Sequence, residues 1–313
     1  MWQRLALSGR RLGTLAGLVG LCLLLWILTP HFLTVSNLLN VLEQTSINAV
    51  IAVGMTFVIL SGGIDLSVGS VLALSGVVMA TLLQEGWAVL PAMAAGLAIG
   101  FAFGAFNGIA IAWGRLPPFI ATLGMMSIAR GCALLFTEGR PVSGFEQSFR
   151  SLATARILGI PAPVVITAAV YLAARFVLSS TRFGRYVYAM GGNEEATRLS
   201  GVNVRLHKTL VYGVAGLTSA IAAVLLTARL NSAQPIAGIM YELDAIAATV
   251  IGGTSLSGGE GGVGGTLIGA LIMGVLRNGL NLLGVSSFLQ QVVIGLVIVF
   301  AVLLDTVLKS KKA

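Results

Sequence analysis

Charged residues are scarce in this sequence. They account for 10% of its 313 residues, whereas soluble domains contain roughly 25%. Hydrophobic residues account for 57%, and the mean hydropathy is +0.96. This leaves too little polar surface to cover a globule, so the composition excludes a soluble protein and indicates one that crosses the membrane many times. The net charge of +8 then indicates basic cytoplasmic loops rather than nucleic-acid binding.

Groups for catalysis and metal binding are also few. The two cysteines, Cys22 and Cys132, lie in apolar runs, so we expect neither a disulfide nor a metal site. The two histidines, His31 and His207, fall in opposite loops and form no ligand pair. A phosphate-binding loop is absent, because the glycines that it needs are missing before Lys208. We therefore expect no enzyme and no catalytic residue, and any ATP must be hydrolysed by a separate chain.

Long apolar runs predict the fold class, an all-α polytopic membrane protein of about ten transmembrane helices. The first run follows three arginines but precedes no small-x-small cleavage site, so we interpret it as a retained span rather than a signal peptide. Two of the predicted spans, 46–60 and 243–252, are shorter than the roughly 20 residues that a crossing needs. The predicted spans cover residues 12–29, 46–60, 67–83, 89–112, 119–136, 162–180, 209–228, 243–252, 265–283 and 288–307.

The distribution of basic residues predicts the orientation. An even number of spans places both termini on one side. Twelve of the 19 Lys and Arg residues fall in the tails and loops of that side, and four fall in the opposite loops. By the positive-inside rule, both termini are expected in the cytoplasm. Three further arginines, Arg130, Arg175 and Arg277, lie within spans, and we expect their side chains to reach towards the membrane surface.

Two polar, glycine-rich segments, residues 61–69 and 252–262, each follow a predicted short span. They are either broken helices that line a transport path or tight turns at the membrane surface, and both interpretations stay open. Matching positions indicate an internal repeat. These positions are Gly62, Gly63, Leu66 and Ser67 with Gly252, Gly253, Leu256 and Ser257, and Val68-Gly69 with Val263-Gly264.

Residues 181–208 form a polar island between two apolar runs, with five basic and two acidic residues. Within it, Asn193 is a good N-cap, and Glu194 and Glu195 would occupy the first helical turn. Arg198 would lie in the last turn, and Gly201 would take the left-handed position after the helix. A short capped helix in a basic loop between spans is typical of a docking element for a cytosolic partner.

Four carboxylates could matter for ion coupling, those of Glu43, Asp65, Glu242 and Asp244. All lie near the ends of predicted spans, whereas an ion-coupled transporter would be expected to hold a carboxylate deep in the bundle. Their positions weaken the ion-coupled alternative without excluding it. For Asp65 we favour a structural role, as a cap of the helix that begins near Ser67.

More specific motifs are spread over the chain. They comprise residues 48–56, 63–70, 119–123, 191–201, 232–235, 241–248, 252–256 and 278–284. Through these motifs the chain resembles the membrane-spanning permease subunits of bacterial ATP-binding-cassette (ABC) importers for monosaccharides, most closely those of ribose importers. The resemblance extends from about residue 28 to the C-terminus.

The resemblance implies a division of labour. Two permease copies, identical or related, would form the pathway in the bacterial inner membrane. Cytosolic ATPase subunits with ATP and Mg²⁺ would bind on one side, and a periplasmic sugar-binding protein would deliver the sugar on the other. This chain would be a single permease domain, 1–313, that binds no cofactor or metal itself, with 181–208 as its cytoplasmic coupling loop. The residues expected at the ATPase are Asn193, Glu194, Glu195, Ala196, Arg198, Leu199 and Gly201.

An uncharged, hydroxyl-rich cargo needs hydrogen-bonding groups along its path but only weak affinity. Each candidate group would serve equally well to join helices. The candidates are Gln44, Asn48, Asp65, Ser67, Asn107, Asn278 and Asn281. Two alternative functions remain: an ABC permease for another small solute, such as a nucleoside or a branched-chain amino acid, and an ion-coupled secondary transporter.

Overall fold

The computed structural model describes residues 2–310, with side chains for 13–300, 302 and 303. Part of the orientation prediction rests on side chains outside this set, those of Arg4, Arg10, Arg11, Lys309, Lys311 and Lys312. The described helices are α1 (Trp2–Leu28), α2 (Val35–Leu60), α3 (Val68–Gln84), α4 (Val89–Ala112), α5 (Pro118–Thr137), α6 (Gln147–Thr154), α7 (Ala162–Ser180), α8 (Arg182–Gly192), α9 (Glu194–Leu199), α10 (Val204–Leu230), α11 (Tyr241–Ile251), α12 (Val263–Leu282) and α13 (Ser287–Ser310).

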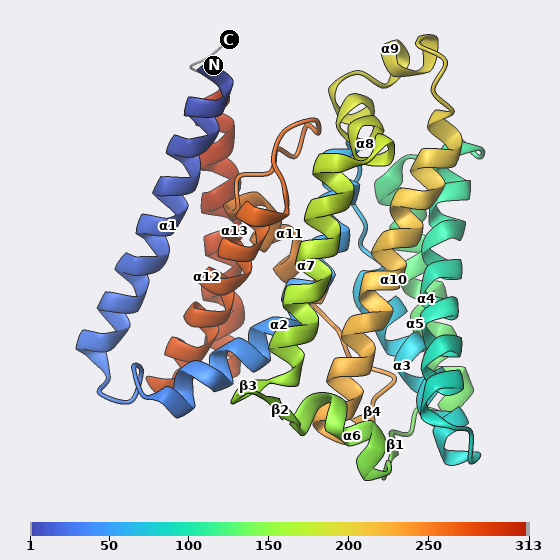
Figure 1. The fold of residues 1–313 in the computed structure, drawn as a ribbon, viewed down its shortest axis with the longest axis vertical. Helices are drawn as coiled ribbons and strands as arrows, with labels where there is room; N and C mark the ends of the chain where they lie inside the picture. Colours follow the sequence, from blue (N-terminus) through green and yellow to red (C-terminus); the bar gives the residue numbers. More distant parts are fainter. Residues whose placement is uncertain (1, 311–313) are drawn as a thin grey trace.

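The helices form one upright bundle with two distinct ends (Figure 1). The start of α1, the end of α13, and the short helices α8 and α9 lie at one end, which we call the α9 end. Helix α6 and four two-residue strands lie at the other, the α6 end. The strands pair antiparallel, β1 (Val142–Ser143) with β4 (Ser232–Ala233) and β2 (Arg156–Ile157) with β3 (Ile160–Pro161). The start of α1 and the end of α13 thus lie at the same end of the bundle, which agrees with an even number of crossings between them.

Six described helices, α2, α4, α5, α7, α10 and α12, are long and apolar enough to cross a membrane, and shorter apolar helices accompany them. The predicted all-α polytopic fold is therefore confirmed. The prediction of a short span at 46–60 is wrong, because α2 has 26 residues. Its polar first half lies outside the predicted span. Part of that half is held within the bundle, where the Asn37 amide pairs with Asn278.

Helices α2 and α10 form the centre of the bundle. In their most apolar stretches 78% and 72% of the residues are buried, against 22% in α4 and α5, which lie at the periphery. Small residues bring α4 against α10, since Gly100 and Gly104 leave no room for a Cβ beside the backbone at Gly216. This close crossing holds α10, one of the two central helices, in place against α4.

Between α10 and α11 the chain runs without helical structure over residues 231–240, which we call the extended segment. Helix α11 has only 11 residues, or roughly 16 Å at 1.5 Å per residue, so the extended segment completes this crossing. Its backbone packs directly on α3, where Gly238 faces Gly69. Non-helical backbone is tolerated at such depth only when protein groups satisfy it.

Arg130 of α5 supplies those groups. Its guanidinium donates to the carbonyl oxygens of Pro235 at 2.6 Å and Ala237 at 2.7 Å. The expectation that Arg130 reaches towards the membrane surface is therefore wrong, because fixed acceptors in the bundle replace the water that it would find there. Arg277 binds the carboxylate of Asp244 at 2.7 Å, and its side chain stays 39% exposed.

The crossing of α11 and α12 makes a first prediction about stability. A Cβ on Gly265 would overlap the carbonyl oxygen of Gly252, whereas one on the adjacent Gly264 meets no atom within 4 Å. Gly265→Ala should lower the free energy of unfolding by about 1–3 kcal/mol, as overpacking does. Gly264→Ala should leave it unchanged or raise it by up to about 1 kcal/mol. Apparent melting temperatures in detergent would measure both, and equal values would contradict the packing described.

Candidate functional site

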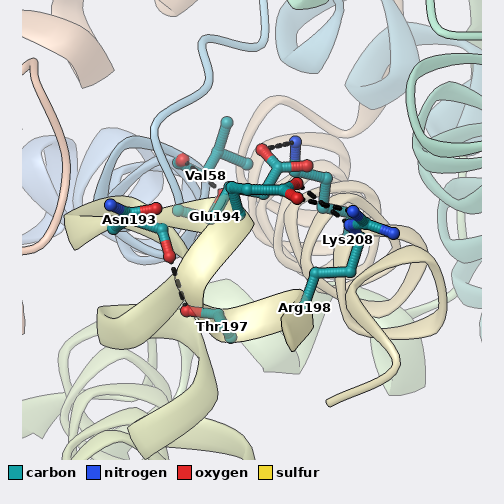
Figure 2. Close-up of polar contacts among 8 residues, drawn as sticks. Val58, Asn193, Glu194, Thr197, Arg198 and Lys208 are labelled. Atoms are coloured by element: carbon teal, nitrogen blue, oxygen red, sulfur yellow. Dashed lines mark hydrogen bonds and ion pairs between the residues drawn. The ribbon is translucent and has the colours of Figure 1, made fainter. Parts of the chain in front are cut away.

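Helix α9 has the capping that its sequence predicts (Figure 2). The Asn193 side chain accepts a hydrogen bond from the Ala196 amide at 2.9 Å, and its carbonyl accepts one from the Thr197 hydroxyl at 2.7 Å. Glu194 begins the helix, Arg198 lies in its last turn, and Gly201 has φ +82°. The predicted short capped helix is therefore confirmed. Its polar face is exposed at the α9 end of the bundle.

The rest of the polar island is more ordered than a loop. Residues Arg182–Gly192 form α8, a helix that the sequence reading did not assign. Phe183, Val187 and Met190 recur at helical spacing; Val187 and Met190 are buried, and Phe183 packs against the core. The Phe183 ring also stacks on Phe57 of α2. These apolar residues are interspersed with basic ones, so the stripe is not evident from the sequence. It packs α8 against the bundle and so positions α9, which follows it.

The charged side chains of α9 are paired within the chain. Arg198 donates from Nε to Glu195 at 3.0 Å, and both side chains are about two-thirds exposed. The hydrogen bonds from Arg198 lower the pKa of Glu195 below its usual value. Glu194 accepts from Lys208 at the start of α10 (Figure 2). The Glu195–Arg198 pair is open to solvent, where ion pairs are weak, so these two groups can exchange their partners for those of a docking protein at little cost.

The end of α8 contacts both glycine-rich segments. The Gly259 amide donates to the carbonyl of Leu60 at 3.0 Å. Gly191 lies against this hydrogen bond, and Gly258 lies against Gly191. We call Leu60, Gly191, Gly258 and Gly259 the glycine junction. Through it, the end of α8 contacts the end of α2 and the turn that precedes α12.

The two glycine-rich segments are turns between separate helices. Each turn follows a helix end with a left-handed glycine, Gly62 at φ +81° and Gly253 at φ +87°. The helices that follow begin at Val68 and Val263, the positions that the internal repeat aligns. The polar residues of the first turn are buried, with Asp65 1% exposed, whereas Ser257 and Glu260 of the second turn are exposed. Neither segment is a gap within one continuous helix, and only the second has polar side chains at the surface.

The seven candidate path residues lie in three places rather than one. In the first, Asp65 accepts from the Ser67 amide at 2.8 Å and its hydroxyl at 2.6 Å, and Asn107 donates to that hydroxyl at 2.9 Å. Asp65 thus makes a local structural contact, but the prediction that it caps α3 is wrong, because it bonds the N-cap residue Ser67 and no amide of the first helical turn. In the second, towards the α6 end, Asn278 pairs with Asn37, and Asn281 accepts from Gln290 at 2.7 Å. These contacts join helices.

The third place holds Gln44 and Asn48, which line a cavity of about 30 Å³ between α2, α11 and α12. Asn48 donates to Asp244 at 3.1 Å, and Asp244 in turn binds Arg277. Neither contact of Asp244 has a local signal in the sequence, because Asn48 lies 196 residues and Arg277 33 residues away from it.

The family model and the relatives that match this chain all describe permease components of transport systems. The family model described as "Branched-chain amino acid transport system / permease component" matches residues 37–302. The ribose import permease protein of Escherichia coli strain K12 is 53% identical over 95% of this chain and 97% of its own length. The same protein of Bacillus subtilis strain 168 is 51% identical over 95% and 92%. The D-allose transport system permease protein of E. coli K12 is 42% identical over 90% and 86%. No solved structure matches the chain.

Proposed function

Since the chain belongs to the permease family that this model describes, we propose that it forms the membrane-spanning path of an ABC importer for ribose. The observation that carries the choice of sugar is the level of identity. The ribose permeases of two distantly related bacteria match more closely than the allose permease does. The chain is a multi-pass permease subunit and not an enzyme, and ATP is hydrolysed by a separate chain.

The partners follow from this role. Two permease copies form the path as a single domain each, 1–313, in the bacterial inner membrane. A periplasmic ribose-binding protein delivers the sugar at the α6 end, and the ATPase subunits, with their ATP and Mg²⁺, bind at the α9 end. Both termini are then cytoplasmic, since the start of α1 and the end of α13 lie with α9 (Figure 1).

We assign α9 as the coupling helix of residues 181–208. Its exposed groups can enter a cleft in the ATPase, and the solvent-exposed Glu195–Arg198 pair is weak enough to exchange. When ATP closes the ATPase dimer, α9 and α8 move together because one residue, Asn193, joins them. The glycine junction passes this movement to α2 and α12, so the bundle repacks between its outward-open and inward-open states.

The docking assignment predicts which variants lose the ATPase. Asn193→Ala removes a cap, which costs about 1 kcal/mol of helix stability, and Glu194→Ala and Arg198→Ala remove exposed charges. Each should reduce co-purification of the ATPase from detergent while the permease keeps its melting temperature within a few degrees. Ser200→Ala is the matched control, because Ser200 is exposed and its hydroxyl bonds only the Ala196 carbonyl within α9.

Reconstitution tests the transport function itself. Liposomes that contain the permease and the ATPase should accumulate ribose only with ATP inside and with the ribose-loaded binding protein outside. Uptake that the permease alone drives with an ion gradient would replace the proposal with an ion-coupled transporter. Uptake of a nucleoside or of leucine in place of ribose would keep the ABC mechanism and change the cargo.

A further inference from the structure

The cavity between α2, α11 and α12 combines features that a purely structural site lacks. Its polar lining is contributed by all three helices, and the opposite wall is formed by apolar or small residues. We call its polar residues the polar pocket. They are Gln44, Thr45, Asn48, Asp244 and Arg277. The volume of about 30 Å³ accommodates one group the size of a water molecule or a hydroxyl.

Two buried atoms of this lining have no hydrogen-bond partner in the described chain, the hydroxyl oxygen of Thr45 and the amide oxygen of Asn48. Thr45 is only 5% exposed. An unpaired buried polar group costs about 1–3 kcal/mol, so proteins rarely keep one without a use for it. Gly274 faces Thr45 and leaves its hydroxyl the room that a side chain would fill. Both oxygens are therefore free to meet a group that enters the pocket.

The charge of the polar pocket indicates the kind of group. Asp244 and Arg277 lie 2.7 Å apart and neutralise one another. A cation that approaches Asp244 also meets the guanidinium, and an anion that approaches Arg277 also meets the carboxylate, so neither is favoured. An uncharged hydroxyl is repelled by neither charge. It can donate to the oxygens of Thr45 or Asn48 and accept from Arg277.

The position of the polar pocket suits a transport path. Asn48 is near the middle of α2, roughly 18–20 Å from either end at 1.5 Å per residue. Asp244 is buried at 3% exposure, whereas the Arg277 side chain is 39% exposed. Arg277 is therefore the charged lining residue that reaches from the pocket to the surface of the subunit.

From these features we propose that the polar pocket binds one hydroxyl group of the sugar during its passage, with the rest of the sugar outside the pocket beside Arg277. This inference rests on the proposed function. One or two hydrogen bonds to a neutral ligand give only weak affinity, which allows the sugar to leave again. Thr45 and Asn48 are the contacts, and the Asp244–Arg277 pair holds Asn48 in place through its amide.

The experiment compares wild-type and variant importers in liposomes with the ATPase and the binding protein. Thr45→Val and Asn48→Leu should reduce ribose uptake at least about tenfold, while ATP hydrolysis stimulated by the loaded binding protein stays near the wild-type rate. Thr45→Ser should restore uptake, because it restores the hydroxyl. Thr249→Val is the matched control, since that buried threonine of α11 is already bonded to the Ala245 carbonyl at 2.7 Å and does not line the pocket.

A second readout does not depend on transport. Millimolar ribose should raise the melting temperature of the purified wild-type permease in detergent, because a ligand that binds the folded state stabilises it. Thr45→Val should lose this shift, and Thr249→Val should keep it. Wild-type ribose uptake together with normal uptake by Thr45→Val, or a ribose-induced shift that Thr45→Val keeps, would overturn the polar pocket alone. Absence of ribose uptake by the wild-type importer would overturn the proposed function.

Discussion

Replacing Gly191 with alanine should reduce ATP-driven ribose uptake at least about tenfold without loss of ATPase binding. The new methyl group would overlap the Leu60 carbonyl and press on the Gly259 amide, the two groups whose hydrogen bond closes the glycine junction. Overpacking of this kind costs roughly 1–3 kcal/mol, and each 1.4 kcal/mol corresponds to a factor of about ten. The surface of α9 is untouched, so docking and transport should separate.

The adjacent Gly192 provides the control. A Cβ there meets no atom within 4 Å, so Gly192→Ala should transport ribose at the wild-type rate. Uptake would be measured in reconstituted liposomes and ATPase binding by co-purification, on the same preparations. Normal transport by Gly191→Ala would show that α8 does not act through the glycine junction, whatever the role of α9.

Arg130→Met should have the largest effect on the folded protein. It removes two charge-assisted hydrogen bonds, each worth about 1.5–3 kcal/mol, and leaves the carbonyls of Pro235 and Ala237 without their donor. We expect the free energy of unfolding to fall by at least about 3 kcal/mol, with little protein in the membrane fraction. Melting temperature in detergent and the amount of membrane-inserted protein are the measurements.

Two further variants distinguish the contact from the charge. Both bonds run from one nitrogen of Arg130, Nη1. Arg130→Lys keeps the charge and several donors, but its ammonium stands on a shorter stem than Nη1, so an intermediate stability is expected. Arg175→Met removes an arginine from α7 whose side chain is exposed, and it should change stability by less than about 0.5 kcal/mol. If Arg130→Met were as stable as Arg175→Met, the extended segment would have to be held by other groups.

Local signals made some of the structure predictable from the sequence. Helix α9 was predicted because capping depends on a few adjacent residues, Asn193 and Gly201 above all. The two turns were located by their glycines, and the predicted spans that follow them began at 67 and 265, within two residues of the observed starts of α3 and α12 at Val68 and Val263. In each of these cases the backbone conformation is determined within about ten residues.

Long-range contacts were not predictable in the same way. The polar first half of α2 was left outside the predicted span, because the residue that pairs with its Asn37 is Asn278, 241 residues later in the chain. Likewise, Arg130 was expected at the membrane surface because nothing near it in sequence offers an acceptor. The polar pocket combines residues of three helices, and only folding brings Asn48 to Asp244.

The Arg130 contact also constrains the order in which the protein is made. Its two acceptors lie 105 and 107 residues later in the chain, so α5 leaves the ribosome long before they exist. An unpaired arginine near the centre of a helix costs about 2.5–3.5 kcal/mol during insertion. Any insertion of α5 before the extended segment is synthesised therefore carries this cost, since a nascent chain that stops before residue 231 lacks both acceptors of Arg130.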